Sequence, residues 1–377
     1  MLRGLPPARP ARAPWATRSD AFSMRLLIVR LGAVGDIIHT LPVAAALRRK
    51  FPDATVDWAV DERYAELLEL TPVIDRPIVL ASRSRPAVAA WLAFRRELRD
   101  GGYDVALDLQ GLAKSAAAVW LSGATRRVGF AAPFLRERWA GWGYDETIHP
   151  GNPRHVIDRN LGILAAVGES EPSAVAWSFP LEAPPSPLVD ELRGDLDAPT
   201  GRYAVLNPNA AWPTKRWPPE RFAAIATHLR DAHGLPAVVV WGPGDGESSA
   251  VAAVDASDGA ATLAPESSLA ELAALLQGAA LVVSGDTGPL HLAAALGVPV
   301  VGLYGPSDPA RNGPWAEADV VVAAECDCYR QRARSGPEGR MARHCTAPSW
   351  CLDRLEVAQV CAAIDRRLGG ADPRTDA

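Results

Sequence analysis

The sequence predicts an α/β protein in which two doubly wound parallel sheets face each other. Short apolar runs of strand composition alternate with stretches of helical periodicity over residues 24–167 and again over 201–354. Residues 168–200, which contain six prolines, read as the linker between these halves. With 377 residues, 48% of them apolar and 22% charged, the chain is long enough for two folded domains and too apolar to be disordered.

The first half has five predicted strands, at Leu26–Arg30, Val56–Val60, Ile78–Leu80, Val105–Asp108 and Arg127–Phe130. Helical patterns separate them at about 36–50, 63–70 and 87–100, and another helix is expected from Lys114. This half should therefore form a parallel sheet covered by helices on both faces.

The second half repeats the pattern, with predicted strands at Tyr203–Leu206, Ala237–Trp241, Ala260–Leu263, Leu281–Ser284 and Val300–Leu303. Helices are expected between them at about 220–232, 248–256, 269–277 and 289–296. We expect the last helix, about 355–368 in the segment 355–377, to pack back onto the first half. Ligands of such sheets bind at the carboxyl ends of the strands, so the cleft between the halves is the expected site.

Charge and hydropathy exclude two classes of protein. The net charge of −5 argues against a nucleic-acid-binding protein, which would carry a basic excess. No apolar run reaches the roughly 18 residues that a membrane-spanning helix needs. Residues 1–23, rich in Arg, Pro and Ala, are interpreted as a disordered tail or as a misassigned start with Met24 as the true initiator.

Four of the five cysteines cluster near the C-terminus, at Cys326, Cys328, Cys345 and Cys351. They could bind zinc or form disulfides, and their spacing matches no standard pair of C-x2-C motifs. A role in local loop structure is the preferred interpretation, and metal binding is the alternative.

The first candidate site is the turn from Leu31 to Asp36, which joins a strand to a helix. Gly32 and Gly35 allow a tight turn and close approach to a ligand, and the helix N-terminus favours anions. Asp36 has two interpretations, a helix-capping residue and a general base facing the cleft. The turn lacks the G-x-G-x-x-G pattern of dinucleotide-binding proteins.

The second candidate is the segment 108–115. Gln110 follows a strand, and Lys114 begins a helix, so both could line the rim of the same cleft. On these residues alone, an ordinary strand–helix turn with Ser115 as a cap is the favoured interpretation.

The third candidate is Lys215, which lies between Trp212 and Trp217 in a loop after a strand. Only three lysines occur in the chain, and the other cations are arginines, which hints that a compact ammonium is needed here. Lys215 is the best candidate to neutralise a diphosphate, and a surface lysine between packing aromatics is the alternative.

The fourth candidate is the segment 284–291, in which small residues after a strand leave helix N-terminal amides available for phosphate. Asp286 would repel a phosphate and is better suited to a sugar hydroxyl, while His291 could equally be a core histidine. A second glycine-rich turn, at 241–247, could bring the carboxylate of Glu247 to a ribose diol.

These segments together resemble glycosyltransferase family nine, the ADP-heptose–lipopolysaccharide heptosyltransferases. The resemblance extends from about Met24 to the last helix and is carried by LIVRLGAVGDIIHTLP, DLQGLAKSA, TKRWP with the following ERF, and SGDTGPLHLAAALGVPVVGLYGPSDP. The last motif is long and specific. The pairing of VDWAV with DLQGLAKSA is closer to the type that adds the first heptose to Kdo.

The resemblance implies a GT-B fold and an inverting transfer that needs no cofactor and no obligatory metal. It makes Asp36 the catalytic base and Lys215 the group that contacts the donor diphosphate. The remaining donor-binding residues would be Glu247 at the ribose, Asp286 at the heptose, and Thr287, Gly288 and His291 around the phosphates. The acceptor would meet Gly35, Gln110, Lys114, Arg83, Arg85 and Arg136.

The implied partners are an ADP-sugar donor and a Kdo-lipid A acceptor, so a cytoplasmic enzyme peripheral to the inner membrane is expected, without nucleic acid. A monomer is one option that the sequence leaves open. The basic acceptor loop is reduced to Arg83 and Arg85, and the cysteine-rich insert at 326–351 is absent from the best-known relatives. The alternatives are a family-nine transferase of other specificity, a nucleotide-binding or NAD-dependent protein, and an inactive lipopolysaccharide-binding scaffold.

Overall fold

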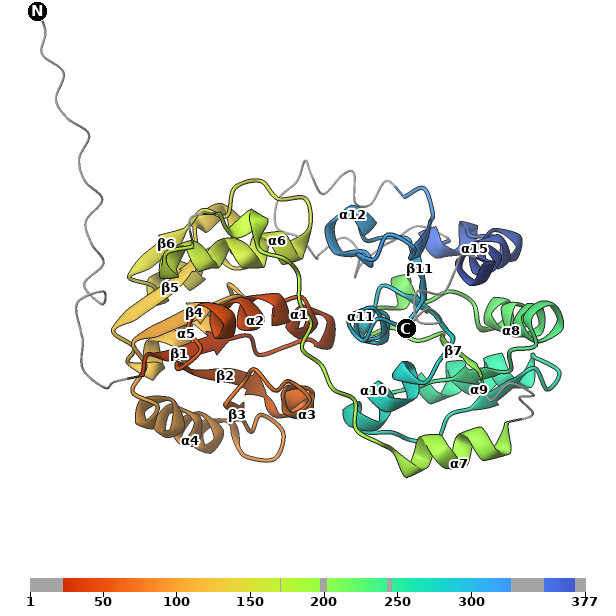
Figure 1. Cartoon of the computed structure of the whole chain (residues 1–377), viewed down its shortest axis with the longest axis horizontal. Helices are drawn as coiled ribbons and strands as arrows, with labels where there is room; N and C mark the ends of the chain where they lie inside the picture. The colour runs from red at the N-terminus through yellow and green to blue at the C-terminus, as the bar shows by residue number, and fades with distance from the viewer. Residues whose placement is uncertain (1–22, 170, 197–201, 243–245, 327–348, 370–377) are drawn as a thin grey trace, which may run out of the picture.

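The computed structural model describes residues 23–369 except 170, 197–201, 243–245 and 327–348. Two six-stranded sheets lie in two halves of the molecule (Figure 1). The expectations for residues 1–22, for Cys328 and for Cys345 fall outside the described residues. Within the described part of the chain, none of the helices combines the length and the apolar character that crossing a bilayer requires.

The first sheet is parallel throughout, in the order β3-β2-β1-β4-β5-β6. Its strands are β1 (Arg25–Val29), β2 (Thr55–Asp61), β3 (Arg76–Leu80), β4 (Val105–Asp108), β5 (Arg126–Phe130) and β6 (Glu146–Ile148). Along β1, Leu26 and Ile28 enter one hydrophobic core, and Leu27 and Val29 enter the core on the opposite face. Because both faces are buried, the strand reads as a continuous apolar run.

Two layers of helices cover this sheet (Figure 1). One layer contains α1 (Val34–Ile38), α2 (Leu41–Lys50) and α3 (Ala65–Glu69), and the other contains α4 (Ala87–Asp100), α5 (Ala113–Ser122) and the 3-10 helix η4 (Arg138–Gly143). The single helix expected at 36–50 is interrupted at residues 39–40, because Pro42 starts a new helix and cannot donate a backbone hydrogen bond. After β6 follow α6 (Val156–Leu161) and η5 (Gly162–Val167).

The second sheet is also parallel, in the order β12-β11-β10-β7-β8-β9. Its strands are β7 (Ala204–Asn207), β8 (Ala237–Val239), β9 (Ala261–Leu263), β10 (Leu281–Gly285), β11 (Val300–Tyr304) and β12 (Val320–Ala323). Its helices are α8 (Pro219–His233), α9 (Gly246–Asp255), α10 (Leu269–Gln277), α11 (Gly288–Ala295) and α12 (Pro309–Asn312). The connection between the halves contains the helix α7 (Pro187–Asp195).

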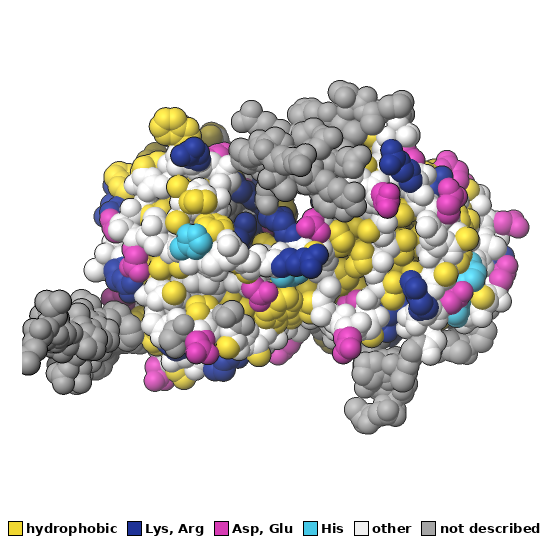
Figure 2. Space-filling view, turned by 90° about the horizontal axis from the view of Figure 1, so that it is seen from above, with side chains coloured by type: hydrophobic (Ala, Val, Ile, Leu, Met, Phe, Trp, Pro, Cys, Tyr) yellow, Lys and Arg dark blue, Asp and Glu magenta, His cyan; other side chains and the backbone are white. Residues whose placement is uncertain are grey.

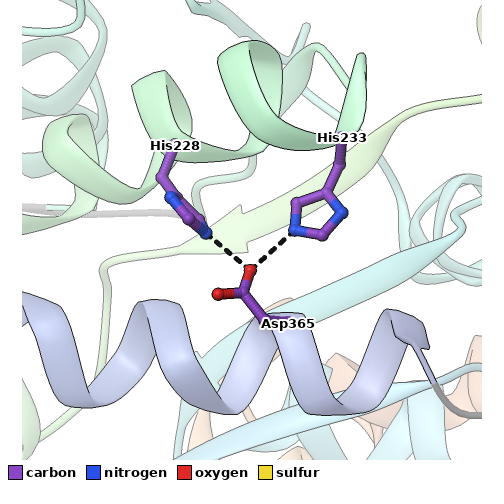
Figure 3. Close-up of side chains that lie close together, drawn as sticks. All are labelled: His228, His233 and Asp365. Atoms are coloured by element: carbon purple, nitrogen blue, oxygen red, sulfur yellow. Dashed lines mark hydrogen bonds and ion pairs between the residues drawn. The ribbon is translucent and has the colours of Figure 1, made fainter.

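The C-terminal helix α15 (Val357–Gly369) is present, but it does not return to the first half as expected. It packs on α8 and on β11 and β12, and its apolar side chains belong to the core of the second sheet. At its surface, Oδ1 of Asp365 lies 2.7 Å from Nε2 of His228 and 2.8 Å from Nε2 of His233, both on α8 (Figure 3). The helix therefore completes the second half.

A disulfide joins Cys326, just after β12, to Cys351 at the start of the 3-10 helix η8 (Cys351–Arg354). Their Cα atoms lie 5.6 Å apart. This pairing agrees with the interpretation that these two cysteines organise the local loop. Cys361, on α15, is a free thiol.

Contacts between the halves are made mainly by helices. Helix α1 of the first half contacts α11 of the second, α3 contacts α10, and α6 contacts α12. The carboxylate of Glu66 accepts a 2.9 Å hydrogen bond from the backbone N–H of Leu269, at the start of α10. The carboxyl ends of the strands of both sheets consequently face the junction, where Figure 2 shows a hollow with Lys and Arg side chains on its wall.

Candidate active site

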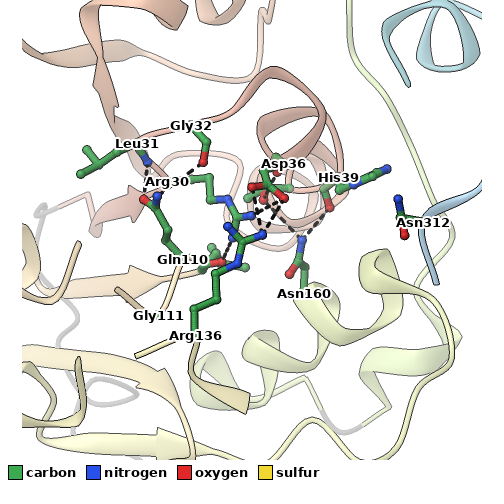
Figure 4. A network of polar contacts seen from close by, with 12 residues as sticks. Arg30, Leu31, Gly32, Asp36, His39, Gln110, Gly111, Arg136, Asn160 and Asn312 are labelled. Carbon is green, nitrogen blue, oxygen red and sulfur yellow. Dashed lines mark hydrogen bonds and ion pairs between the residues drawn. The ribbon is translucent and has the colours of Figure 1, made fainter. Parts of the chain in front are cut away.

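Asp36 lies in the first turn of α1, and two arginines converge on its carboxylate (Figure 4). Nη2 of Arg30 lies 2.7 Å from Oδ1, and Nη2 of Arg136 lies 3.2 Å from Oδ2. The N-cap residue of α1 is Ala33, so the capping interpretation of Asp36 is wrong. About a fifth of the Asp36 side chain (22%) stays exposed, which leaves the carboxylate accessible from the cleft.

Arg30 is the partner that sequence reasoning missed. Its side chain is only 1% exposed, and besides Asp36 it donates to the carbonyl of Leu109. Arg30 directly follows an apolar strand, and a charged side chain that is buried at such a position needs a partner of opposite charge. This was the feature of the sequence from which the pairing with Asp36 could have been predicted. Burial alone would raise the pKa of Asp36, but the cations of Arg30 and Arg136 outweigh it and hold that pKa well below its usual range. Asp36 is therefore ionised at neutral pH.

Gln110 and Gly32 fix the turn that presents Asp36. Oε1 of Gln110 accepts a 2.9 Å hydrogen bond from the N–H of Leu31, which ties the end of β4 to the end of β1. Gly32 has a φ of +150°, and a Cβ there would lie 2.3 Å from the ring of Tyr64, so only glycine fits. Gln110 thus lies beside the turn that leads to Asp36, and its side chain holds the backbone of that turn.

The rest of the segment 108–115 forms an ordinary strand–helix turn, which was the favoured interpretation of these residues. The buried carboxylate of Asp108 accepts hydrogen bonds from the N–H groups of Gln110 and Gly111 and from the hydroxyl of Tyr144. Ser115 is not the N-cap of α5, which is Leu112, but its hydroxyl accepts from the N–H of Leu112 in the first turn.

Three predicted acceptor-binding cations lie near the ends of β2, β3 and β4. Nζ of Lys114 lies 3.4 Å from Oδ2 of Asp61, a buried carboxylate at the end of β2. Burial opposes ionisation of Asp61, but hydrogen bonds from Arg63 and Ser82 lower its pKa to about 2. Arg83 and Arg85 are exposed in the turn that precedes α4.

Glu62 orders that turn. Its carboxylate accepts hydrogen bonds from the backbone N–H of Arg83, from the N–H of Ser84 at 3.0 Å and from the hydroxyl of Ser84 at 2.6 Å. The two arginine side chains therefore extend from a fixed backbone. They lie on the same edge of the sheet as Asp36.

Asp286, directly after β10, is the centre of the second cluster. Nζ of Lys215 lies 2.5 Å from Oδ2, and Nε2 of His291 lies 3.0 Å from Oδ1. Nδ2 of Asn312, which the sequence did not single out, donates to Oδ1 at 2.7 Å. Burial would raise the pKa of Asp286, but Lys215 and His291 hold it far below its usual range.

Lys215 ends the 3-10 helix η7 (Pro213–Lys215) and is mostly buried, with 18% of its side chain exposed. Its ammonium lies 5.0 Å from the centre of the Trp212 ring, within the range of a cation–π contact. Trp217 is a core residue, whose indole N–H donates to the carbonyl of Leu355. The interpretation of Lys215 as a surface lysine is therefore wrong.

The start of α11 closes the site from the second half. Thr287 is its N-cap residue, and its hydroxyl is held by Asn207 at 3.0 Å and by Ser284 at 2.9 Å. A Cβ at Gly288 would lie 2.8 Å from Val34, and a Cβ at Gly35 would lie 2.6 Å from His291. These two glycines allow α1 and α11 to touch, so Gly35 serves the junction in this structure.

Two histidine rings meet at this junction. His291 and His39 are buried, with ring centres 4.4 Å apart, and belong to opposite halves. Among the described residues, neither Nδ1 of His291 nor Nε2 of His39 has a hydrogen-bond partner. Buried ring nitrogens of this kind require a partner, such as water or a bound ligand.

Glu247 lies in the first turn of α9 and is exposed. Residues 243–245 of the same glycine-rich turn are outside the described part of the chain. Of the predicted site residues, the structure brings Asp36 and Arg136 together, and Lys215, Asp286 and His291 together. Because α1 packs on α11, the two clusters face each other across the junction.

Comparison with known proteins assigns the family. The profile of glycosyltransferase family 9 (heptosyltransferase) matches residues 91–342. The chain is 31% identical to lipopolysaccharide heptosyltransferase 1 of Pseudomonas aeruginosa, over 81% of this chain and 85% of the relative. It is 30% identical to the protein of that name from Escherichia coli K12, over 80% of this chain and 94% of the relative.

Solved structures agree in fold. The E. coli heptosyltransferase WaaC with ADP has a TM-score of 0.72 and 27% identity, covering 91% of this chain and 100% of that one. The same enzyme with ADP-2-deoxy-2-fluoro heptose has a TM-score of 0.65 and 29% identity, covering 80% and 94%. These matches confirm the GT-B fold and a sugar-transferring enzyme in place of an NAD-dependent one. This chain belongs to glycosyltransferase family 9, the heptosyltransferases.

Proposed function

We propose that this enzyme transfers heptose from ADP-L-glycero-D-manno-heptose to the Kdo of a Kdo-lipid A acceptor, the first heptose of the lipopolysaccharide inner core. Relatives named lipopolysaccharide heptosyltransferase 1 support this choice. The observation that carries it is the packing of α1 on α11, because this contact sets the carboxylate of Asp36 opposite the cluster of Lys215 and Asp286.

Each half has its own task in this proposal. Residues 24–167 bind the acceptor, 201–354 bind the nucleotide sugar, and 168–200 connect them. Crystal structures of the E. coli enzyme with ADP and with a fluorinated ADP-heptose support a nucleotide-sugar donor. The N-terminus of α11 offers backbone N–H groups to the diphosphate, and the hydroxyl of Thr287 lies beside them.

In the reaction, an acceptor hydroxyl oxygen attacks the anomeric carbon of the heptose from the face opposite the diphosphate. The bond from this carbon to the phosphate oxygen breaks, and ADP leaves with the electron pair, so the anomeric centre inverts. Asp36 takes the proton of the attacking hydroxyl. Its low pKa makes it a weak base at rest, and its contacts with Arg136, at 3.2 and 3.3 Å, are the ones that can be released.

The acceptor can release this contact, since a Kdo residue carries a carboxylate that competes for Arg136. The Arg136 side chain is 37% exposed, whereas Arg30 stays buried beneath Asp36. When Arg136 turns to the acceptor, the proton affinity of Asp36 rises as the substrate arrives. We infer that Arg83, Arg85 and Lys114 bind further anionic groups of the acceptor, beside Gln110 and Gly35.

On the donor side, Lys215 neutralises the charge that develops on the leaving diphosphate. At rest its ammonium is bound to Oδ2 of Asp286, which keeps it oriented. Because Oδ1 already contacts His291 and Asn312, a heptose hydroxyl would donate to the remaining lone pair of Oδ2. Nδ1 of His291, which has no partner among the described residues, can donate to a donor phosphate when the ring carries both protons, because Nε2 faces Asp286. Glu247 is assigned to the ribose diol.

The acceptor is a glycolipid, so we place the enzyme in the cytoplasm at the inner membrane surface. Mass spectrometry of the product from ADP-heptose and Kdo-lipid A tests the proposal, and a mass increase of one heptose is expected. An acceptor that already carries the first heptose is the matched control. Transfer to this control alone, or to neither, would contradict the proposal.

A further inference from the structure

The large exposed hydrophobic side chains of the described residues gather on one layer of the first half. Val88 (75% exposed) and Leu92 (61%) lie on α4, Trp120 (47%) lies on α5, and Trp139 (82%) and Trp142 (54%) lie on η4. We call these five side chains the exposed apolar face. Scattered exposed apolar residues are ordinary, but a contiguous group marks an interaction site.

The three elements of this face are neighbours. Helix α4 packs beside α5 on one face of the first sheet, and α5 packs beside η4 (Figure 1 labels α4 and α5). The rings of Trp120 and Trp142 are 6.1 Å apart. A shallow groove of about 360 Å³ runs between α4 and α5 and is lined by Val88, Leu92 and Leu121, with Ala87, Trp91 and Arg95.

The surroundings of the face are basic, although the whole chain has a net charge of −5. Residues 81–100 contain five arginines against two acidic residues, and Arg138 precedes Trp139. Arg95, Arg96 and Arg99 are exposed along α4. Tryptophan beside arginine suits the boundary of an anionic membrane, where the indole rings lie at the headgroups and the cations attract the surface charge.

The position of the face relative to the acceptor-binding residues favours a membrane over a protein partner. Helix α4 begins just after Arg83 and Arg85, Lys114 lies in the first turn of α5, and η4 begins two residues after Arg136. Each of the three elements therefore has an acceptor-binding cation at the end that meets the cleft. An acceptor whose sugar enters there would keep its lipid part beside the exposed apolar face.

We propose that the exposed apolar face docks on an anionic phospholipid bilayer, which holds the lipid part of the acceptor while its sugar reaches Asp36. This proposal rests on the proposed function for the identity of the acceptor. The docking itself requires only the apolar side chains and the arginines. It can therefore be tested without any sugar transfer.

Co-sedimentation of the full chain with vesicles is the first test. Vesicles of phosphatidylethanolamine with phosphatidylglycerol should bind the protein, and vesicles of phosphatidylcholine should bind it less. Trp139→Ser with Trp142→Ser should weaken binding at least about tenfold, because interfacial binding scales with buried apolar area. Val88→Ser with Leu92→Ser provides an independent test on α4.

A second pair of variants tests the charge. Arg95→Gln with Arg96→Gln should lower binding to phosphatidylglycerol vesicles about tenfold, and added salt should reduce the difference. The matched control is Arg202→Gln with Arg366→Gln, which removes two exposed arginines from the second half. This control should bind as the wild type does. Thermal unfolding shows whether each variant remains folded.

Several outcomes would overturn the proposal. A wild-type protein that does not bind the anionic vesicles would do so, and so would folded tryptophan variants that bind as well as the wild type. A dimer that these variants dissolve, without vesicle binding, would assign the face to a second copy of the chain.

Measurements of enzyme activity provide the remaining test. The tryptophan variants should keep their turnover on a soluble acceptor without acyl chains and lose it on an acceptor embedded in vesicles. A protein that binds vesicles through this face but transfers heptose to neither acceptor would refute the proposed function and support the docking surface.

Discussion

Replacing Asp36 is expected to affect both stability and turnover, for different reasons. The carboxylate lies 2.7 Å from the guanidinium of Arg30, whose side chain is 1% exposed. Asp36→Ala or Asp36→Asn would leave this cation buried without its counter-charge, which costs about 3–5 kcal/mol of unfolding free energy. Loss of a general base should lower turnover at least about 100-fold. Donor affinity should change little, since the donor cluster lies in the other half.

The two effects are separated by a second substitution. Arg30→Met combined with Asp36→Asn removes both charges, so the stability lost in Asp36→Asn should largely return while turnover stays low. Urea unfolding gives the stability, ADP release gives turnover, and calorimetry with ADP gives the affinity of the donor site. A folded Asp36→Asn enzyme with near-normal turnover would show that Asp36 only neutralises Arg30.

Three further predictions concern the charged groups. Lys215→Ala should lower turnover more than donor affinity, because the charge that develops on the leaving group is stabilised mainly in the transition state. Lys215→Arg should also lower turnover. A variant that changed donor affinity alone would contradict this role of Lys215. Arg136→Gln removes a cation 3.2 Å from Asp36. The Coulomb attraction between these two charges is roughly 1–3 kcal/mol at effective dielectric constants of about 40–80 for this partly exposed pair. Because the pKa of Asp36 in the free enzyme then rises, the acidic limb of kcat/KM for the acceptor should move to higher pH, and an unmoved limb would refute the pairing. Burial at the junction lowers the pKa of His39, so protonation of this ring below roughly pH 6.5 should favour separated halves. X-ray scattering should then show a larger radius of gyration, and His39→Asn should abolish this response.

The central strands of the fold could be predicted because their residues are buried on both faces. The edge strands β6 and β12 were missed: β6 has only three residues and no apolar run, and β12 is a four-residue apolar run, VVVA, that is only partly buried. The amphipathic pattern of α15 predicted a helix, but such a pattern does not specify which sheet its apolar side covers. The helix covers the second sheet, through Val360, Ala363 and Ile364.

The site could be predicted where a motif places its residues on one turn. Asp286 follows β10 directly and Asp36 lies in the first turn of the helix after β1, so their location at the sheet edge follows from topology. Their partners are distant in sequence: Arg136 is 100 residues from Asp36, and Asn312 is 26 residues from Asp286. Such pairs depend on how loops from different strands meet, which a single sequence does not reveal.

The distribution of charge at the junction explains how the halves can separate during catalysis. Asp36 is paired with Arg30 and Arg136 of its own half, and Asp286 is paired with Lys215 of the other half. Arg311 adds only a smaller electrostatic contribution to Asp36 across the junction. Separation therefore leaves each carboxylate with its own cation, so no unpaired buried charge is created. Where α1 meets α11, the junction is formed by Gly35, Gly288, Val34 and two histidine rings, and elsewhere it includes the hydrogen bond from Leu269 to Glu66. If the halves separate to admit donor and acceptor, both carboxylates would therefore keep the ionised state that the proposed reaction requires.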